Sequence, residues 1–207
     1  MQNRNYQKEL EKMIERHTRE GEKPRLLLHS CCAPCSSHCL EYLKDKFEIT
    51  VFYYNPNIWP EEEYHMRVEE QARLIQDMNA KLPGADISLI VGSYDPERFS
   101  AMAAGKETLP EGGERCFGCF SFRLFEAAKE AKAGGFDYFT TTLTISPLKN
   151  APKLNEIGET LAKQLDVAWL PSDFKKKNGY LRSTQLSEEY GLYRQNYCGC
   201  EFSRKEL

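Results

Sequence analysis

The chain has 207 residues, of which 41% are hydrophobic and 29% charged, and its formal net charge is −3. This length suits one domain with a hydrophobic core that needs no covalent cross-links. The charged fraction and the short apolar runs exclude a membrane-spanning protein, and the even spread of apolar side chains excludes a disordered one.

Helices and strands are predicted to alternate along the chain. Apolar side chains recur at helical spacing among charges over residues 3–19, which predicts an amphipathic helix. Five short apolar runs rich in β-branched or aromatic residues are predicted to be strands: 25–30, 48–54, 86–91, 136–143 and 167–170. Helices are expected over 35–46, 60–79, 96–105, 118–133, 150–165 and 184–190.

The alternation predicts an α/β fold with a doubly wound, mostly parallel five-stranded sheet that helices cover on both faces. We expect a single domain over 1–207, with an N-terminal helix in 1–24, a sheet core in 25–174 and a cysteine-bearing C-terminal segment in 175–207. Ligands of such sheets bind beyond the carboxyl ends of the strands. The segments after the strands contain no standard phosphate-binding glycine loop.

Eight cysteines are many for a chain of this kind. The chain begins with charged residues and no apolar leader, so we expect a cytoplasmic location. In that compartment, clustered cysteines are metal ligands or redox-active thiols more often than structural disulfides. Seven of them fall into three groups, which are Cys31, Cys32 and Cys35, then Cys116 and Cys119, then Cys198 and Cys200.

Seven thiols exceed the needs of one metal site. Converging thiolates repel each other unless a soft metal or an iron–sulfur cluster neutralises them, and a structural zinc site uses four ligands. Two metal sites, or one site plus a redox pair, are therefore favoured. Cys116 and Cys119 alone fit a structural zinc half-site equally well. Cys39, one helical turn after Cys35, is expected to be a buried, inert thiol.

Polar residues near the predicted strand ends are candidates for contact with a substrate. Asn55 follows the second strand, Ser146 and Lys149 follow the fourth, and Lys175 follows the fifth. Arg194 belongs to a group of tyrosines and arginines that suits stacking and backbone contact on RNA, although ordinary surfaces carry such groups too.

Charge is distributed unevenly along the chain. The net charge is +2 over residues 1–40, −8 over 41–114 and +3 over 115–207. A nucleic-acid-binding face is usually basic, so segment 41–114 is a poor candidate for contact with an RNA backbone.

Five motifs occur in order and at characteristic spacings. They are H-x-C-C-A-P-C (29–35), E-R-C-x-x-C (114–119), T-T-L-x-x-S-P-x-K (141–149), W-L-P-S-D-F-K-K (169–176) and L-Y-R-Q-x-Y-C-G-C (192–200). Each motif alone is weak evidence, but the set together resembles the QueH family of epoxyqueuosine reductases.

The resemblance implies a function in tRNA modification. It implies that epoxyqueuosine at the wobble position of the anticodon is reduced to queuosine without cobalamin, by an enzyme whose core resembles the adenine nucleotide alpha hydrolase (HUP) fold. That superfamily binds ATP through a glycine-rich loop after the first strand, whereas residues 30–36 contain no glycine, so ATP binding is not expected. The implied partners are the anticodon arm of tRNA and an external one-electron donor such as a ferredoxin or flavodoxin.

The resemblance also implies a 4Fe–4S cluster beside a second mononuclear metal, expected to be iron. The spacing of the cysteines leaves open which four hold the cluster. Our working assignment puts the cluster on Cys32, Cys35, Cys116 and Cys119. The second metal is then placed near Cys31, Cys198 and Cys200, completed by a carboxylate such as Asp173.

The sequence leaves open which residue is the general acid, and it allows two other classes of protein. Asp173, Tyr54 and Tyr197 are candidates for protonating the departing oxygen, and none is distinguished by sequence. One rival is an iron–sulfur enzyme that thiolates tRNA on the same type of fold, which generally requires the missing ATP loop. The other is a non-catalytic RNA-binding protein stabilised by zinc.

Overall fold

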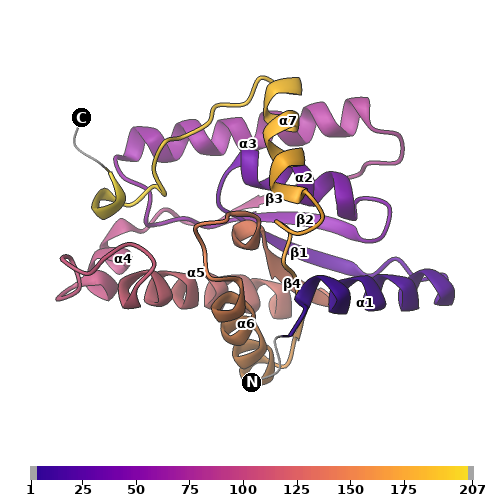
Figure 1. The fold of residues 1–207 in the computed structure, drawn as a ribbon, viewed down its shortest axis with the longest axis horizontal. Helices are drawn as coiled ribbons and strands as arrows, with labels where there is room; N and C mark the ends of the chain where they lie inside the picture. The colour runs from indigo at the N-terminus through magenta and orange to yellow at the C-terminus, as the bar shows by residue number, and fades with distance from the viewer. Residues whose placement is uncertain (1–3, 205–207) are drawn as a thin grey trace.

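Five parallel strands form the centre of the structure, which is a computed structural model that describes residues 4–204 (Figure 1). The strands are β1 (Arg25–Ser30), β2 (Glu48–Tyr53), β3 (Ser88–Val91), β4 (Tyr138–Thr141) and β5 (Ala168–Trp169). Their order in the sheet is β3-β2-β1-β4-β5. The chain therefore winds outwards in both directions from β1, and the strand order reverses beside the carboxyl end of β1. The predicted α/β class is confirmed.

Helices pack on both faces of the sheet (Figure 1). They are α1 (Tyr6–Glu20), α2 (Ala33–Leu43), α3 (Glu61–Lys81), α4 (Pro96–Ala103), α5 (Glu114–Ala133), α6 (Ala151–Leu165) and α7 (Gly179–Glu189), with short 3-10 helices η1 (Thr142–Ile145) and η2 (Glu201–Ser203). Side chains alternate along a strand, so β1 supplies both cores. Leu26 and Leu28 pack with α1, α2 and α3, while Leu27 packs with α5 and α6.

Several boundaries differ from the predicted ones, and the differences matter for the site. The fourth strand, expected over 136–143, ends at Thr141, whose Oγ1 accepts a hydrogen bond from the Leu143 amide at 3.2 Å and turns the chain into η1. Helix α5 begins at Glu114 rather than at 118, so Cys116 lies in its first turn. Helix α7 begins at Gly179 rather than at 184, because the adjacent Asn178 takes a left-handed conformation that starts the helix earlier.

The first helix starts three residues later than predicted and ends at Glu20. Helix α1 begins at Tyr6, and residue 3 of the predicted helix lies outside the described residues. None of the helices within 4–204 combines the length and the apolar character that crossing a bilayer requires.

Gly158 allows α6 to pack closely on β5. A Cβ atom at this position would lie 2.3 Å from Cδ2 of Trp169, whose indole donates to Asn155 Oδ1 at 3.0 Å. Real Cβ atoms do not approach a ring so closely, so any larger residue forces α6 away from the sheet.

We therefore expect Gly158→Ala to lower the free energy of unfolding by about 1–3 kcal/mol, as overpacking of a core does. Alanine stabilises a helix by about 1 kcal/mol relative to glycine, so helix propensity alone predicts that this substitution raises the free energy of unfolding. Urea unfolding monitored by circular dichroism measures the change. Lys163→Ala, at an exposed position of the same helix, is the control and should leave stability unchanged. A Gly158→Ala protein as stable as the wild type would contradict this packing.

Candidate metal centre

Three thiols converge where β1 ends and α2 begins. Cys31 and Cys32 follow β1 directly, and Cys35 lies in the first turn of α2. The Sγ atoms of these three residues all lie within 4.8 Å of one another, and those of Cys31 and Cys32 are 3.8 Å apart. All eight cysteines of the chain carry free thiols. This triad is a donor set for a soft metal or a metal–sulfur cluster.

The C-terminal segment brings a fourth thiol to the same place. A cavity of about 320 Å³ is lined by Cys31 and Cys35 on one side and by Cys198 on the other. The Lys149 ammonium also lines it and donates a hydrogen bond to Cys198 Sγ at 3.1 Å. Burial lowers the pKa of Lys149, but attraction to Cys198 outweighs this effect, so the pKa is raised and the side chain stays charged.

The other three clustered cysteines, Cys116, Cys119 and Cys200, do not line this cavity. Cys119 and Cys200 are buried together in a small apolar cluster with Phe99. Cys116 accepts a hydrogen bond from the Gly112 amide at 3.2 Å. The structure therefore groups Cys31 with Cys32 and Cys35, and Cys119 with Cys200. Our division of the cysteines between two metals grouped them differently, and it stays a prediction.

Arg123 is the positive charge at the centre of this arrangement. Its side chain is 1% exposed, and within residues 4–204 it forms no ion pair with a carboxylate. One guanidinium nitrogen lies 3.9 Å from Cys119 Sγ, and another donates to Oδ1 of Asn55, whose amide donates to the Ser30 carbonyl at 2.9 Å. A buried cation without a counter-ion is unfavourable, so thiolates are the anions that this position suits.

The acidity of the triad reflects this environment. Hydrogen bonds from the Cys32 and Cys35 thiols, together with the charge of Arg123, hold the pKa of Cys31 well below its usual range. The same sharing of protons raises the pKa of Cys32 to about 12 and raises that of Cys35. One thiolate at Cys31 is thus favoured, and a bound cation is needed before the other two ionise.

His29 ties together the strands that carry the site. Its Nε2 donates to the Tyr54 carbonyl at 3.2 Å, and its Nδ1 accepts from Thr141 Oγ1 at 2.9 Å. Burial, and then the nearby charge of Arg123, lower the pKa of His29 to about 3, so the ring is neutral. Both ring nitrogens are occupied, which makes His29 a connection between β2, β1 and β4 rather than a metal ligand.

A second group of metal-type ligands lies at the opposite end of the sheet. His17, Glu20 and Glu22 have ligand atoms within 4.8 Å of one another. His17 Nδ1 already contacts Glu22 at 2.7 Å, and its Nε2 contacts the Tyr138 hydroxyl at 3.0 Å. These contacts anchor α1 to β4 and leave no nitrogen of His17 unengaged.

The chain matches a known family over most of its length. The family described as "Epoxyqueuosine reductase QueH" matches residues 26–206. The chain belongs to the QueH family.

Three curated relatives carry the name "Epoxyqueuosine reductase QueH". One from Staphylococcus epidermidis is 45% identical over 96% of this chain and 84% of its own length. One from Streptococcus pyogenes is 43% identical over 97% of this chain and 78% of its own length. One from Thermotoga maritima is 36% identical over 87% of this chain and 91% of its own length. The resemblance to QueH drawn from five motifs is thereby confirmed.

The three general-acid candidates of this QueH-family chain lie in different surroundings. Tyr197 lines the cysteine cavity, and its hydroxyl donates to the Trp59 carbonyl at 2.7 Å. Tyr54 is buried outside the cavity lining, stacks on Phe52, and has its pKa raised to about 12 by burial. Asp173 is buried and pairs with Lys175, also away from the lining.

Some of the residues predicted to contact the substrate line the cavity, and others lie away from it. Ser146 and Lys149 line the cavity. Asn55 is fully buried and holds Arg123, and Lys175 is occupied by Asp173. Arg194 is exposed and lines a small adjoining pocket with Ser146 and Cys35.

Sequence reasoning missed five polar residues that line the cavity: Glu111, Arg123, Gln195, Asn196 and Ser203. Only Arg123 carried a usable signal. It stands four residues after Cys119, and on α5 it shares the buried face of Phe120 and Leu124, where a charge is unusual. Glu111, Gln195 and Asn196 lie outside helices and strands, where no periodicity indicates which way a side chain points.

The role of Arg123 as counter-charge can be tested with metal affinity. A metal held by several thiolates carries a net negative charge, so Arg123→Met should weaken Zn²⁺ binding by about tenfold or more, while Arg123→Lys should retain most of it. Competition with a colorimetric chelator measures both. Equal affinity in the Met variant and the wild type would show that the guanidinium does not act on the thiolates.

Proposed function

We propose that this chain reduces epoxyqueuosine to queuosine in tRNA. Removal of the epoxide oxygen consumes two electrons and two protons, breaks two C–O bonds, forms a C=C bond and releases water. The observation that carries the proposal is the thiol triad of Cys31, Cys32 and Cys35 beside a cavity that Cys198 and Lys149 also line. Membership of the QueH family supports the same reaction.

The donor set fits the implied 4Fe–4S cluster and a second metal, which we propose to be iron. Three of the seven clustered thiols, those of Cys31, Cys35 and Cys198, line one cavity, and the buried Arg123 and the half-buried Lys149 offset the negative charge that thiolate ligation creates. The triad Cys31, Cys32 and Cys35 is suited to hold one metal group, and Cys119, Cys198 and Cys200 are suited to the other. When bound, these groups supply single electrons and a Lewis acid for the epoxide oxygen.

The protein's own part in the reaction is electrostatic. Lys149 stays protonated, and its Nζ points into the cavity towards Cys198. A cation in this position stabilises the negative charge that develops on the epoxide oxygen as its C–O bonds break. Of the three general-acid candidates, we favour Tyr197 as the proton donor, because it is the one that lines the cavity.

The partners proposed for the reaction are the anticodon arm of tRNA and an external one-electron donor such as a ferredoxin or flavodoxin. Two electrons must arrive for each turnover, and the described residues themselves offer only thiols as reductants. An iron–sulfur centre passes electrons singly, which favours a one-electron donor.

The activity is tested by mass spectrometry of nucleosides after anaerobic incubation with epoxyqueuosine-containing tRNA and a reductant. We expect queuosine to replace epoxyqueuosine. Lys149→Met should lower the rate about 10²-fold or more, because it removes the charge at the developing oxyanion. Lys153→Met, four residues further along in the first turn of α6, is the matched control, because Lys153 does not line the cavity. Unchanged epoxyqueuosine with a fully loaded protein would refute the reductase, and a protein that holds only zinc would favour the RNA-binding alternative.

Alkylation of cysteines distinguishes ligands from bystanders. In the anaerobically reconstituted protein, the seven clustered cysteines should resist iodoacetamide, and treatment with a chelator should expose them to it. Cys39 should stay unlabelled in both forms, since it is fully buried and its thiol donates to the Cys35 carbonyl at 3.4 Å. Peptide mapping identifies the labelled positions. Rapid labelling of Cys198 or Cys200 in the loaded protein would remove them from the ligand set.

A further inference from the structure

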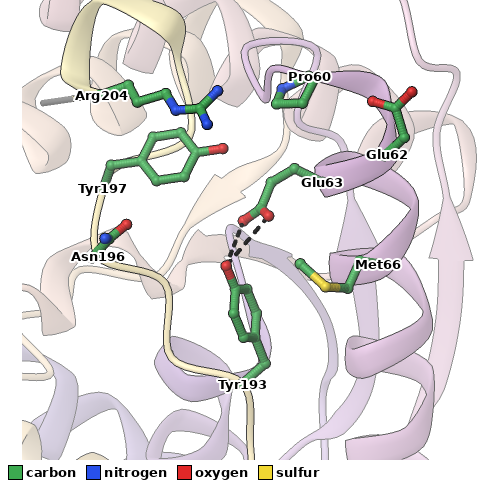
Figure 2. A pocket seen from close by; sticks show the side chains of 8 residues that line it. All are labelled: Pro60, Glu62, Glu63, Met66, Tyr193, Asn196, Tyr197 and Arg204. Carbon is green, nitrogen blue, oxygen red and sulfur yellow. Dashed lines mark hydrogen bonds between the residues drawn. The ribbon is translucent and has the colours of Figure 1, made fainter. Parts of the chain in front are cut away.

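A second pocket, shown in Figure 2, shares two lining residues with the cysteine cavity. It has a volume of about 530 Å³ and lies between the start of α3 and the C-terminal segment. Asn196 and Tyr197 line both the pocket and the cysteine cavity, so the two spaces adjoin through these residues. A ligand can therefore occupy both.

The inner wall of this pocket carries a fixed carboxylate. Glu63 points into the pocket towards Tyr193, whose hydroxyl donates to both carboxylate oxygens at 3.3 Å (Figure 2). Behind it, the buried Arg67 holds Glu63 at 2.6 Å. A carboxylate can accept about four hydrogen bonds. Arg67 occupies Oε1 with a hydrogen bond from Nε at 2.7 Å and an ion-pair contact from Nη2 at 2.6 Å, so the capacity that Glu63 keeps for a ligand with N–H groups lies mainly on Oε2. The neighbouring Glu62 is directed away from Tyr193, at the rim.

Aromatic rings complete the pocket. Tyr193 is 39% exposed, and Tyr197 lines the opposite side with Asn196. Tyrosine rings beside an acceptor of N–H groups suit a flat heterocycle that carries N–H donors. The cysteine cavity differs from this pocket, because the cations Lys149 and Arg123 lie next to its thiols, although Glu111 also lines it. In the pocket, Arg204 lies with the carboxylates of Glu62 and Glu63. The two spaces together suit a molecule with a donor-rich planar end and an oxygen-bearing end.

We propose that this pocket binds the 7-deazaguanine base of the wobble nucleoside while its epoxide-bearing substituent enters the cysteine cavity. A guanine-type base presents adjacent N1–H and amino donors on one edge, which match the Glu63 carboxylate. The substituent leaves the base at C7, on the opposite edge. Correspondingly, Glu63 lies on α3 and the shared residues Asn196 and Tyr197 lie across the pocket (Figure 2). This inference rests on the proposed tRNA substrate.

The test is binding of anticodon-arm RNA hairpins to the reconstituted protein by fluorescence anisotropy. One hairpin carries guanosine at the wobble position, and the other carries inosine, which lacks only the amino group. The wild type should bind the guanosine hairpin about fivefold or more tightly. Glu63→Gln should abolish this preference, because an amide cannot accept both donors. Glu62→Gln makes the same change of charge at the rim and should preserve it.

The outcomes separate this inference from the proposed reaction. Equal affinity of the wild type for the two hairpins, or a preference that survives Glu63→Gln, would overturn the base pocket even if epoxyqueuosine is still reduced. If loss of the partner of Arg67 prevents Glu63→Gln from folding, Tyr193→Ala decides. It should weaken binding of both hairpins about tenfold through lost stacking, and unchanged binding would overturn the proposal.

Discussion

The buried charge of Arg123 is the constraint on which the site depends. A guanidinium with no carboxylate partner within residues 4–204 is stable inside the protein only beside other anions or strong acceptors. Asn55 fixes its position from β2, and the thiols of three separate chain segments surround it. Hydrogen bonds from Cys32 and Cys35, and then the same charge, lower the pKa of Cys31, which favours the thiolate that a metal requires. His29, neutral and doubly hydrogen-bonded, keeps β2, β1 and β4 in register beneath it.

The cysteine cavity and the pocket that holds Glu63 adjoin each other and carry different charged groups. Cations lie next to the thiols, and the Glu63 carboxylate lies beside tyrosines in the neighbouring pocket. Because the C-terminal segment lines both spaces, one stretch of chain carries Cys198, a proposed metal ligand, and Tyr193 and Asn196, which line the proposed base pocket. A substrate that fills both spaces is oriented by its two ends before any chemistry occurs.

Much of the fold followed from local patterns. Short β-branched runs separated by amphipathic helices are sufficient to predict a parallel sheet, since few other arrangements bury them. Boundaries were predicted less well where side chains rather than propensities decide them. Thr141 ends β4 by capping η1, and Asn178 starts α7 early through a left-handed backbone. Likewise, Tyr54 and Asp173 stand near strand ends as ligand-binding residues do, yet packing against Phe52 and pairing with Lys175 occupy them.

The sequence alone determined the class of fold, the family and the set of seven clustered thiols, because each of these depends only on residue types and their spacing along the chain. Only the tertiary structure decided which thiols share a position and what surrounds them. Cys31 and Cys198 are 167 positions apart in the chain and line one cavity, and Arg123 turns inwards to meet them. Arg123 lies on a helix whose periodicity places it on the buried face, but the positions of Cys31 and Cys198 arise from the packing of a loop and a C-terminal segment that lack periodicity, so no local pattern encodes their meeting.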